Sequence, residues 1–366
     1  MKIKCDSANF RDTISIVSKY VNAKAISPIL ECVLIVAKED SVMLRATDGV
    51  LSIEKNIVAE VVEQGETVCQ GKFLNEYTKK MSNGELEIST NDKNVMKIKY
   101  EDSVSKIQCL DAKEFPKSEV LSNAKSFEIK ESDLKNLISK SIFATAQDDI
   151  RPILKGCLFE IKGGVVKSIG LDGFRLAVAK YPAISQSDEF SAVVPTKVLN
   201  EISKSLGNTE NTIKVYFTKN HIYLELDGYK ITSRLLSGDY IAYENVIPKS
   251  FANVLSVERE KFELALERVA TLSKFSKNNL IKLDIGEETM VVCAESEFGS
   301  IKETLPISYN GKGLSICFNC KYFLDALGNV EDDIIRLSLN DQNKPCVITA
   351  NQDSEYLFLI LPIRSV

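Results

Sequence analysis

One stretch organises this chain: Arg151-Pro152-Ile153-Leu154, followed at a fixed distance by Asp172-Gly173-Phe174-Arg175-Leu176. An earlier stretch repeats it, because Ser27-Pro28-Ile29-Leu30 leads to Asp48-Gly49, and both Pro28 and Asp48 lie 124 positions before their counterparts. After a further 124 positions, Asn279-Leu280-Ile281-Lys282-Leu283 keeps the alternating apolar pattern without the Asp-Gly pair. Each repeat is large enough to bury a core of its own, so the period indicates domains rather than a solenoid. We expect three domains, at residues 1–123, 124–249 and 250–366.

Each repeat shows the same order of elements. A first helix is expected over 8–20 behind Asp6 or Ser7, near 134–142 behind Ser132 or Asp133, and along the stripe Phe262, Leu266, Val269 and Leu272. Second helices are expected at 72–81, 196–206 and 321–330. Short apolar strands separate them, including the run 32–36 and a hairpin that turns at Lys219-Asn220. This pattern predicts the α+β class, with two helices per domain packed on antiparallel sheets.

Composition is that of an ordinary globular protein, with 44% hydrophobic and 27% charged residues. No apolar run approaches the roughly 18 residues that a membrane span needs, and the first residues lack the apolar core of a signal peptide. The nine cysteines are an odd number without a framework spacing, which favours reduced thiols. We therefore expect a cytoplasmic protein.

A catalytic or metal-binding constellation is not evident. His221, the only histidine, lies at an expected hairpin tip and is interpreted as a solvated turn residue. Cys317 and Cys320 have the C-x-x-C spacing of a redox motif, but the other repeats have no such pair, and a zinc site needs more ligands. Phosphate-binding and nucleophile motifs are also missing from the sequence. We expect a scaffold or binding protein with no cofactor or metal, and we keep a redox enzyme as an alternative.

Charge is unevenly distributed along the chain, whose net charge is −5. The stretches 7–22, 72–82, 131–146, 196–206, 258–277 and 320–328 contain the expected helices and together carry +5, which leaves −10 for the rest. Lysine-rich helix faces are commonly just solvated. If the repeat places all the helices on one surface, however, that surface is basic, as a surface that follows a phosphate backbone must be.

The chain resembles the bacterial sliding clamp family, the β subunits of the replicative DNA polymerase III. The most specific segments are Arg151–Gly156 with Gly170–Ala177, and the C-terminal Leu361-Pro362-Ile363-Arg364. Family members typically read A-T-D-G-H-R-L-A and M-P-M-R at the latter two places, and Ala46-Thr47-Asp48-Gly49 keeps the first of these in repeat one. Phe174 stands here where the family has histidine, and Ile241 where it often has proline.

The resemblance implies a head-to-tail homodimer whose two subunits, each contributing half, form a closed ring around duplex DNA, the DNA clamp fold. It implies a non-enzymatic processivity factor for DNA replication in the bacterial cytoplasm, which holds the polymerase, the clamp loader and repair proteins through short linear peptides. A head-to-tail contact closes only if the rotation per subunit closes. A protein-binding scaffold without a DNA role remains the alternative.

The resemblance also assigns site residues. The peptide pocket would be formed in its first part by Leu154, Leu171, Gly173, Phe174, Arg175, Leu176, Ile241, Val246, Leu359 and Leu361, and in its second part by Asn319, Tyr322, Pro362, Ile363 and Arg364. We expect an apolar floor, with Arg175 and Arg364 meeting polar peptide groups at the rim. The DNA contacts would be Lys24, Lys72, Lys79, Lys80 and Lys197. Leu272 and Phe275 are expected to form apolar contacts in the dimer.

Overall fold

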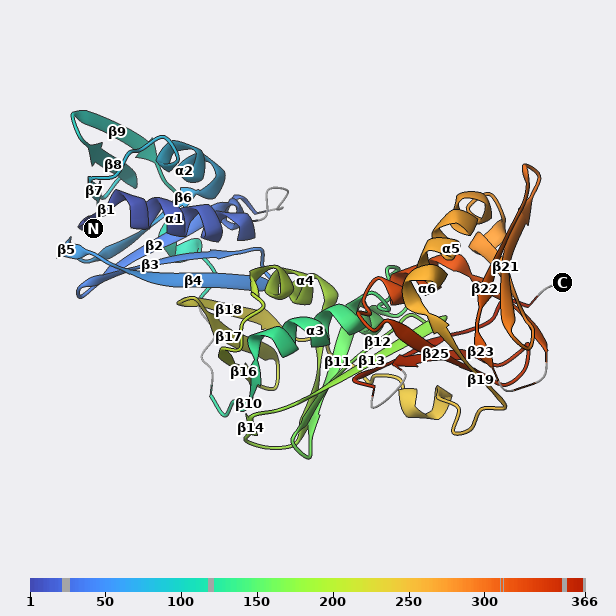
Figure 1. Cartoon of the computed structure of the whole chain (residues 1–366). Coiled ribbons are helices and arrows are strands. Elements are labelled where there is room, and N and C mark those ends of the chain that lie inside the picture. Colours follow the sequence, from blue (N-terminus) through green and yellow to red (C-terminus); the bar gives the residue numbers. More distant parts are fainter. Residues whose placement is uncertain (22–26, 118–121, 310, 312, 351–353, 365–366) are drawn as a thin grey trace. The chain divides into compact units, whose positions relative to one another are not determined.

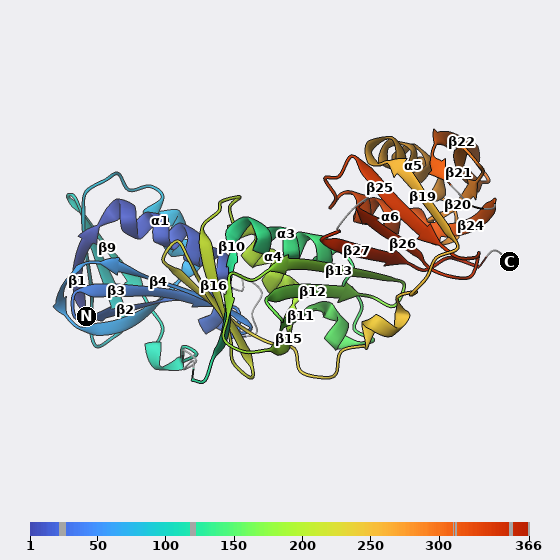
Figure 2. The same cartoon turned by 60° about the horizontal axis from the view of Figure 1, so that its bottom comes forward.

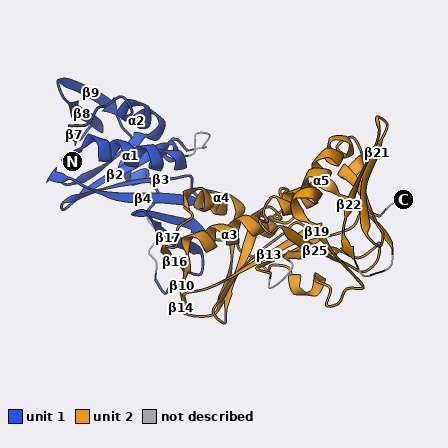
Figure 3. Cartoon of the chain, in the orientation of Figure 1, with its two compact units in different colours: residues 1–126, 213–234 blue, residues 127–212, 235–366 orange. Residues whose placement is uncertain are grey.

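The structure is a computed structural model that describes residues 1–21, 27–117, 122–309, 311, 313–350 and 354–364. The chain forms two compact units, which Figure 3 colours separately. Unit 1 comprises residues 1–126 and 213–234, and unit 2 comprises residues 127–212 and 235–366. This division does not test the domain boundaries expected at 123 and 249, which stay predictions.

The strands of unit 1 form antiparallel sheets (Figure 1). One sheet has the order β5-β1-β7-β8-β9, and another contains the run β16-β17-β18-β4-β3-β2-β6. The bounds are β1 Lys2–Asp6, β2 Cys32–Lys38, β3 Ser41–Thr47, β4 Leu51–Val58, β5 Glu60–Glu63, β6 Gly65–Gln70, β7 Glu85–Thr90, β8 Val95–Tyr100, β9 Ser103–Gln108, β16 Thr212–Phe217, β17 His221–Leu226 and β18 Tyr229–Arg234. The expected hairpin is present, since Phe217 pairs with Ile222.

The helices of unit 1 pack on these sheets through their apolar sides. They are α1 Ser7–Val17, α2 Gly71–Thr78 and the short 3-10 helices η1 Ser18–Tyr20, η2 Pro28–Glu31 and η3 Ala112–Glu114. Phe10, Ile14 and Val17 of α1 are fully buried. Asp6 caps α1 as expected, because its carboxylate accepts a hydrogen bond from the Asn9 backbone N–H at 2.8 Å.

Unit 2 contains a nine-stranded antiparallel sheet with the order β15-β11-β12-β13-β27-β26-β25-β19-β23, and a four-stranded sheet β22-β21-β20-β24. β10 pairs with β14. The bounds are β10 Lys125–Lys130, β11 Gly156–Lys162, β12 Val165–Leu171, β13 Arg175–Pro182, β14 Ser185–Gln186, β15 Phe190–Pro195, β19 Asn253–Glu258, β20 Leu280–Ile285, β21 Thr289–Ser296, β22 Gly299–Pro306, β23 Ser308–Tyr309, β24 Leu314–Asn319, β25 Ile334–Leu339, β26 Cys346–Ala350 and β27 Tyr356–Ile360.

The helices of unit 2 are α3 Glu131–Ile142, α4 Thr196–Ser205, α5 Arg259–Ser273 and α6 Cys320–Leu327, with the 3-10 helices η4 Pro152–Lys155, η5 Tyr243–Val246 and η6 Lys277–Asn279. Figure 2 shows α3 and α4 over one face of the β11–β13 strands. The expected stripe of α5 is confirmed, because Phe262, Leu266 and Val269 are fully buried.

The capping expected for α3 is wrong. Ser132 and Asp133 are not its N-cap, because the helix begins at Glu131 and no side chain caps it. Glu131 is instead buried, and its carboxylate accepts hydrogen bonds from the Gly207 backbone N–H at 2.5 Å and from the Thr209 hydroxyl. Glu131 therefore fixes the 207–209 segment to the first turn of the helix. Burial of a carboxylate is costly unless it is hydrogen-bonded, as this one is.

The repeat inferred from sequence is reproduced in the strands. β2, β11 and β20 begin at Cys32, Gly156 and Leu280, which are spaced by the same 124 positions as the sequence motif. β3, β12 and β21 follow with the same spacing, and so do β4, β13 and β22. The three copies therefore share one strand register over the segment that the sequence comparison identified.

The turn between the second and third strand of the first two copies has one geometry. In copy two the Asp172 carboxylate accepts from the backbone N–H groups of Phe174 and Arg175 at 2.9 and 3.0 Å. In copy one Asp48 accepts from Val50 and Leu51 at 2.9 and 2.8 Å. The glycine that follows each aspartate, Gly49 or Gly173, has a φ of +93° or +95°, a backbone conformation that favours glycine.

Candidate functional site

Part of the expected peptide pocket is a single apolar cluster in unit 2. Leu154, Leu171, Leu176 and Leu359 are at most 5% exposed and pack together, with the half-buried Ile241 against them. They come from η4, β12, β13 and β27, and Leu176 lies directly opposite Leu359 in the β13–β27 ladder. We call this group the Leu176 cluster. Residues more than 200 positions apart in the sequence, Leu154 and Leu359, thus form one apolar floor.

Exposed apolar side chains adjoin this cluster in sequence. Phe174 is 61% exposed, Val246 50% and Leu361 39%. Gly173 has no atom within 4 Å of the place where a Cβ would stand, so the turn that presents Phe174 is open to solvent. Apolar groups that remain this exposed beside a packed floor are typical of a site that a partner covers.

The C-terminal segment crosses between the two parts of the expected site. The Leu361 backbone N–H donates to the Phe174 carbonyl at 2.9 Å, and the Ile363 N–H donates to the Cys317 carbonyl at 2.8 Å. Pro362 between them is half-buried, and Arg364 is exposed. These two bonds hold residues 361–363 against the β12–β13 turn at one end and against β24 at the other.

The structure departs from the expectation for Arg175. This side chain is only 9% exposed, and its guanidinium donates to Asp172 Oδ2 at 3.0 Å and to Asp325 Oδ2 at 2.5 Å. Its Cζ also lies 4.6 Å from the centroid of the Tyr322 ring. Arg175 is therefore a buried link between β13 and α6 and not a rim cation that a peptide meets first, whereas the exposed Arg364 fits that expectation.

Aromatic rings join the two parts of the site. The rings of Phe174 and Tyr322 are nearly parallel, with 6.4 Å between their centroids and 26° between their planes. Asn319, expected in the second part, is the N-cap of α6, because its side-chain oxygen accepts from the Lys321 N–H at 3.0 Å. The candidate site therefore contains two neighbouring aromatic rings, the exposed Phe174 and the half-buried Tyr322. The side-chain amide of Asn319 is engaged in capping α6.

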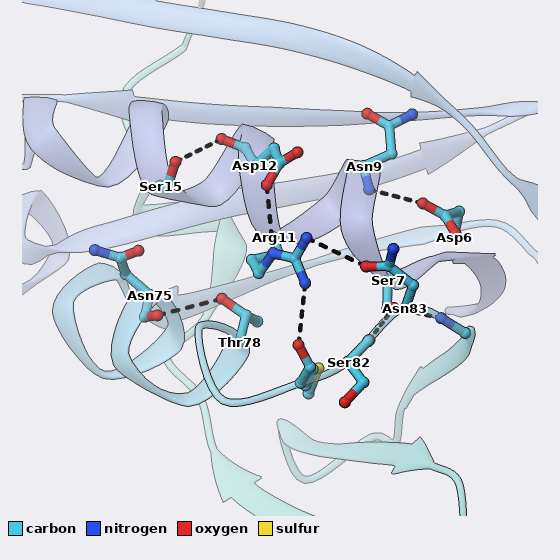
Figure 4. Close-up of polar contacts among 12 residues, drawn as sticks. Asp6, Ser7, Asn9, Arg11, Asp12, Ser15, Asn75, Thr78, Ser82 and Asn83 are labelled. Carbon is cyan, nitrogen blue, oxygen red and sulfur yellow. Dashed lines mark hydrogen bonds and ion pairs between the residues drawn. The ribbon is translucent and has the colours of Figure 1, made fainter.

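Lysines expected to contact DNA are exposed wherever the structure describes them. Lys72, Lys79 and Lys80 lie on or just after α2, and Lys197 lies in the first turn of α4. Lys24 lies outside the described residues. Arg11 joins α1 to the chain after α2, since its guanidinium donates to the carbonyl of Met81 at 3.0 Å and to Asn83 Oδ1 at 3.4 Å. Figure 4 shows Arg11 between α1 and Asn83.

The dimer contacts expected at the end of α5 have unequal exposure. Leu272 is 8% exposed and belongs to the core, so it offers little surface to a partner, contrary to the expectation. Phe275 is 56% exposed, and its ring lies edge-on to Phe298, which is 67% exposed, with 4.8 Å between the centroids. Sequence reasoning missed Phe298, although it stands in the hairpin that replaces the Asp-Gly turn.

Cys317 and Cys320, the two cysteines considered for redox chemistry, do not have the properties of reactive thiols. Burial raises the pKa of Cys320 to about 11 and also raises the pKa of Cys317, whereas a reactive thiol has a lowered pKa. Among the described residues, no group of histidine, cysteine and carboxylate side chains could hold a metal ion. His221 is half-buried at the start of β17 and is not the solvated turn residue that we expected.

Comparison with known proteins identifies the family. Family models match in three consecutive parts, described as the N-terminal domain of the DNA polymerase III beta subunit (residues 1–119), its central domain (128–241) and its C-terminal domain (244–364). The chain belongs to the DNA polymerase III β subunit family. Its fold is therefore that of three β-clamp domains with mixed helix and sheet, as the repeat predicted.

Individual relatives agree with this assignment. The chain is 32% identical to the beta sliding clamp of Halalkalibacterium halodurans, with all of both chains covered, and 29% identical to that of Staphylococcus epidermidis over 95% of each. Among solved structures, the DNA polymerase sliding clamp of Bacillus subtilis matches all of the chain with a TM-score of 0.95 at 28% identity. A Pseudomonas aeruginosa sliding clamp bound to griselimycin matches with a TM-score of 0.91 at 26% identity.

Proposed function

We propose that this protein is the processivity clamp of a bacterial replicative DNA polymerase. Two subunits form a closed ring around duplex DNA, and the ring tethers polymerase, clamp loader and repair proteins without reading the sequence. The protein performs no catalysis of its own and works in the cytoplasm. The observation that carries the proposal is the match of all three β-clamp domain models along one chain, together with the Leu176 cluster where partner peptides would dock.

The proposed ring needs an apolar contact between subunits. Phe275 and Phe298 form an exposed aromatic pair in the third repeat, and neighbouring exposed aromatic rings are typical of protein interfaces. Lys274, whose ammonium lies 5.1 Å from the Phe275 ring centroid, adds a cation at the edge of this pair. We propose that the pair docks against the first repeat of the second subunit and closes the ring.

The proposed DNA contact is electrostatic. The exposed lysines of α2 and α4 stand on elements that occupy equivalent places in two repeats, so a ring of repeats presents them on a common surface. Lysine is a mobile point charge that attracts any phosphate, which suits a protein that must move along DNA. Because the chain as a whole is acidic, the remaining surface does not compete for the duplex.

Partner binding is assigned to the Leu176 cluster with its exposed margin. A linear peptide would place apolar anchors against Leu176 and Leu359 and lie along Phe174, Leu361 and Pro362. Phe174 carries no charge, and the only histidine of the chain lies in unit 1. Peptide affinity should therefore vary little between pH 6 and pH 8 on account of histidine titration.

A fluorescence titration with a short Gln- and Leu-rich clamp-binding peptide tests this assignment. Phe174→Ala and Leu361→Ala remove exposed contacts without emptying the core, and each should weaken binding about five- to thirtyfold, the range of an interface anchor worth about 1–2 kcal/mol. Ile184→Ala, at a position 54% exposed outside the predicted pocket, is the matched control and should bind normally. Unchanged affinity in both pocket variants would place the peptide elsewhere.

A further inference from the structure

Unit 1 contains a counterpart of the proposed peptide site in which polar side chains replace the apolar ones. In unit 2, Leu176 pairs with Leu359. Two positions after Leu359, Leu361 donates its backbone N–H to the Phe174 carbonyl. In unit 1, Ser52 pairs with Thr232. Two positions after Thr232, Arg234 donates its backbone N–H to the Val50 carbonyl at 3.1 Å. Ser52 and Val50 lie 124 positions before Leu176 and Phe174. The β4–β18 ladder thus has the register of the β13–β27 ladder.

Side chains at the matched positions differ in kind. The apolar positions of unit 2 are Ile169, Leu171, Leu176, Val178, Leu357 and Leu359, and all of them lie in or against the Leu176 cluster. Their counterparts in unit 1, in the same order, are Arg45, Thr47, Ser52, Glu54, Lys230 and Thr232. An apolar anchor has no floor to pack on in this copy, because every matched position carries a polar group.

A cavity of about 70 Å³ lies at this place in unit 1. Among the described residues that line it are four cationic side chains, Arg45, Lys117, Lys230 and Arg234, together with His221 and one carboxylate, Glu54. At roughly 30 Å³ per water molecule, the space suits a few waters or one small oxyanion, and it is too small for a peptide side chain of anchor size with its backbone.

Three charged side chains in the cavity alternate in sign. Glu54 lies between two cations, with Oε2 at 3.8 Å from Arg45 Nε and Oε1 at 3.5 Å from Lys230 Nζ. Arg45 is 5% exposed and also donates to the Pro116 carbonyl at 3.0 Å and to the Ser52 hydroxyl at 3.2 Å, so its position is fixed. One carboxylate thus faces two cations, and the exposed Lys117 and Arg234 add two more positive charges.

We propose that this cavity binds a small tetrahedral oxyanion of the phosphate class. An excess of positive charge beside a buried guanidinium is unfavourable, and an anion among these side chains offsets the repulsion. Arginine and lysine are the side chains that bind phosphate oxygens, and the Ser52 and Thr232 hydroxyls add groups able to hydrogen-bond. This inference is independent of the proposed clamp function, because it concerns a cavity that the peptide site and the DNA contacts do not use.

Isothermal titration of inorganic phosphate into the full-length protein, at constant ionic strength, tests the proposal. Saturable binding at one site per chain is expected, with acetate and chloride at least tenfold weaker. Lys117→Gln combined with Arg234→Gln removes the two exposed charges and should weaken phosphate binding at least tenfold. Both side chains are exposed, so the variant should melt at the same temperature and bind the clamp peptide normally.

The matched control combines Lys93→Gln with Lys106→Gln. These lysines are exposed in the β7–β8 turn and in β9 of the same unit, do not line the cavity, and change the net charge by the same amount. Control protein that binds phosphate as the wild type does supports the site. The proposal is overturned if phosphate binding is not saturable, if acetate binds equally well, or if both double variants behave alike.

Discussion

At the scale of single residues, the sequence predicted the packing of the apolar side chains in the proposed peptide site better than the surroundings of Arg175. Leu154, Leu171, Leu176 and Leu359 are buried together because cross-strand apolar neighbours in β12, β13 and β27 pack with an apolar residue of η4 and are removed from water. Arg175 was assigned to the rim, yet its partner Asp325 is 150 positions away, and only folding brings the two together. A contact between residues so far apart in the sequence leaves no local pattern from which it can be predicted.

The buried position of Arg175 leads to a stability prediction. Arg175→Met should leave Asp172 and Asp325, which are 14% and 29% exposed, without their cation. Breaking a buried pair typically costs about 3–5 kcal/mol, so the thermal unfolding midpoint should fall by several degrees. Calorimetry of the purified variant measures this.

Arg268→Met is the control for that variant. Arg268 likewise makes two charged hydrogen bonds, in its case both to the Glu303 carboxylate, but its side chain is 54% exposed. Water and salt screen such a pair, so its loss should leave the midpoint nearly unchanged. Equal shifts in the two variants would contradict the structural role that we assign to Arg175.

At the scale of elements, the repeat of 124 residues predicted recurring strands, and the structure shows that three strands of each copy keep this spacing. The helices that were expected are present within a few residues of their predicted bounds. The α3 cap was missed because Ser132 and Asp133 fit the usual preference, while the 207–209 segment that engages Glu131 is distant in sequence. The β4–β18 pairing, which joins strands of two repeats, also had no local signal.

Close packing of α3 on β12 gives a prediction for Gly170. A Cβ at this position would lie 2.2 Å from the Ser141 carbonyl oxygen, which belongs to the helix backbone and cannot move alone. Gly170→Ala should therefore push α3 from the sheet and destabilise unit 2 by about 1–3 kcal/mol, the usual range for overpacking. Urea unfolding followed by circular dichroism measures the loss.

Gly84→Ala is the comparison for this effect. A Cβ at Gly84 would meet the Tyr100 ring at 3.7 Å, an ordinary contact, so the variant should retain nearly wild-type stability. If Gly170→Ala is equally well tolerated, the approach of α3 to β12 is looser than the structure indicates.

At the scale of the whole molecule, ring closure is predicted to depend on the aromatic pair of the third repeat. Phe275→Ala with Phe298→Ala removes two exposed rings, and burial of one such side chain contributes roughly 1.5–3 kcal/mol. The dimer should dissociate at least tenfold more readily, and sedimentation velocity at submicromolar concentration should show monomer. Ile150→Ala with Ile184→Ala, at positions 83% and 54% exposed in the second repeat, should leave the dimer intact. An unchanged dimer in the Phe variant would mean that another surface closes the ring.

DNA contact is predicted to depend on charge alone. Neutralising Lys79, Lys80 and Lys197 should weaken binding equally for every DNA sequence, and each lost phosphate contact should reduce the log–log salt slope by about 0.9. Fluorescence anisotropy over a salt series measures the slope. Neutralising Lys93, Lys106 and Lys219 instead, which are exposed on other elements, should leave it unchanged. A slope that is the same in both variants would mean that the helix lysines do not face the duplex.

A protein that encircles DNA is retained on closed circles and lost from linear duplex, which an ordinary DNA-binding surface is not. Protein placed on nicked circular duplex by a bacterial clamp loader and ATP should remain with the DNA during gel filtration at low salt, because a closed ring cannot leave a circle. Cutting the same complex once with a restriction enzyme should release the protein, since a ring slides off free ends. Equal retention on circular and linear duplex would contradict the claim and would identify an ordinary DNA-binding surface, while no retention on either would favour a scaffold that does not act on DNA.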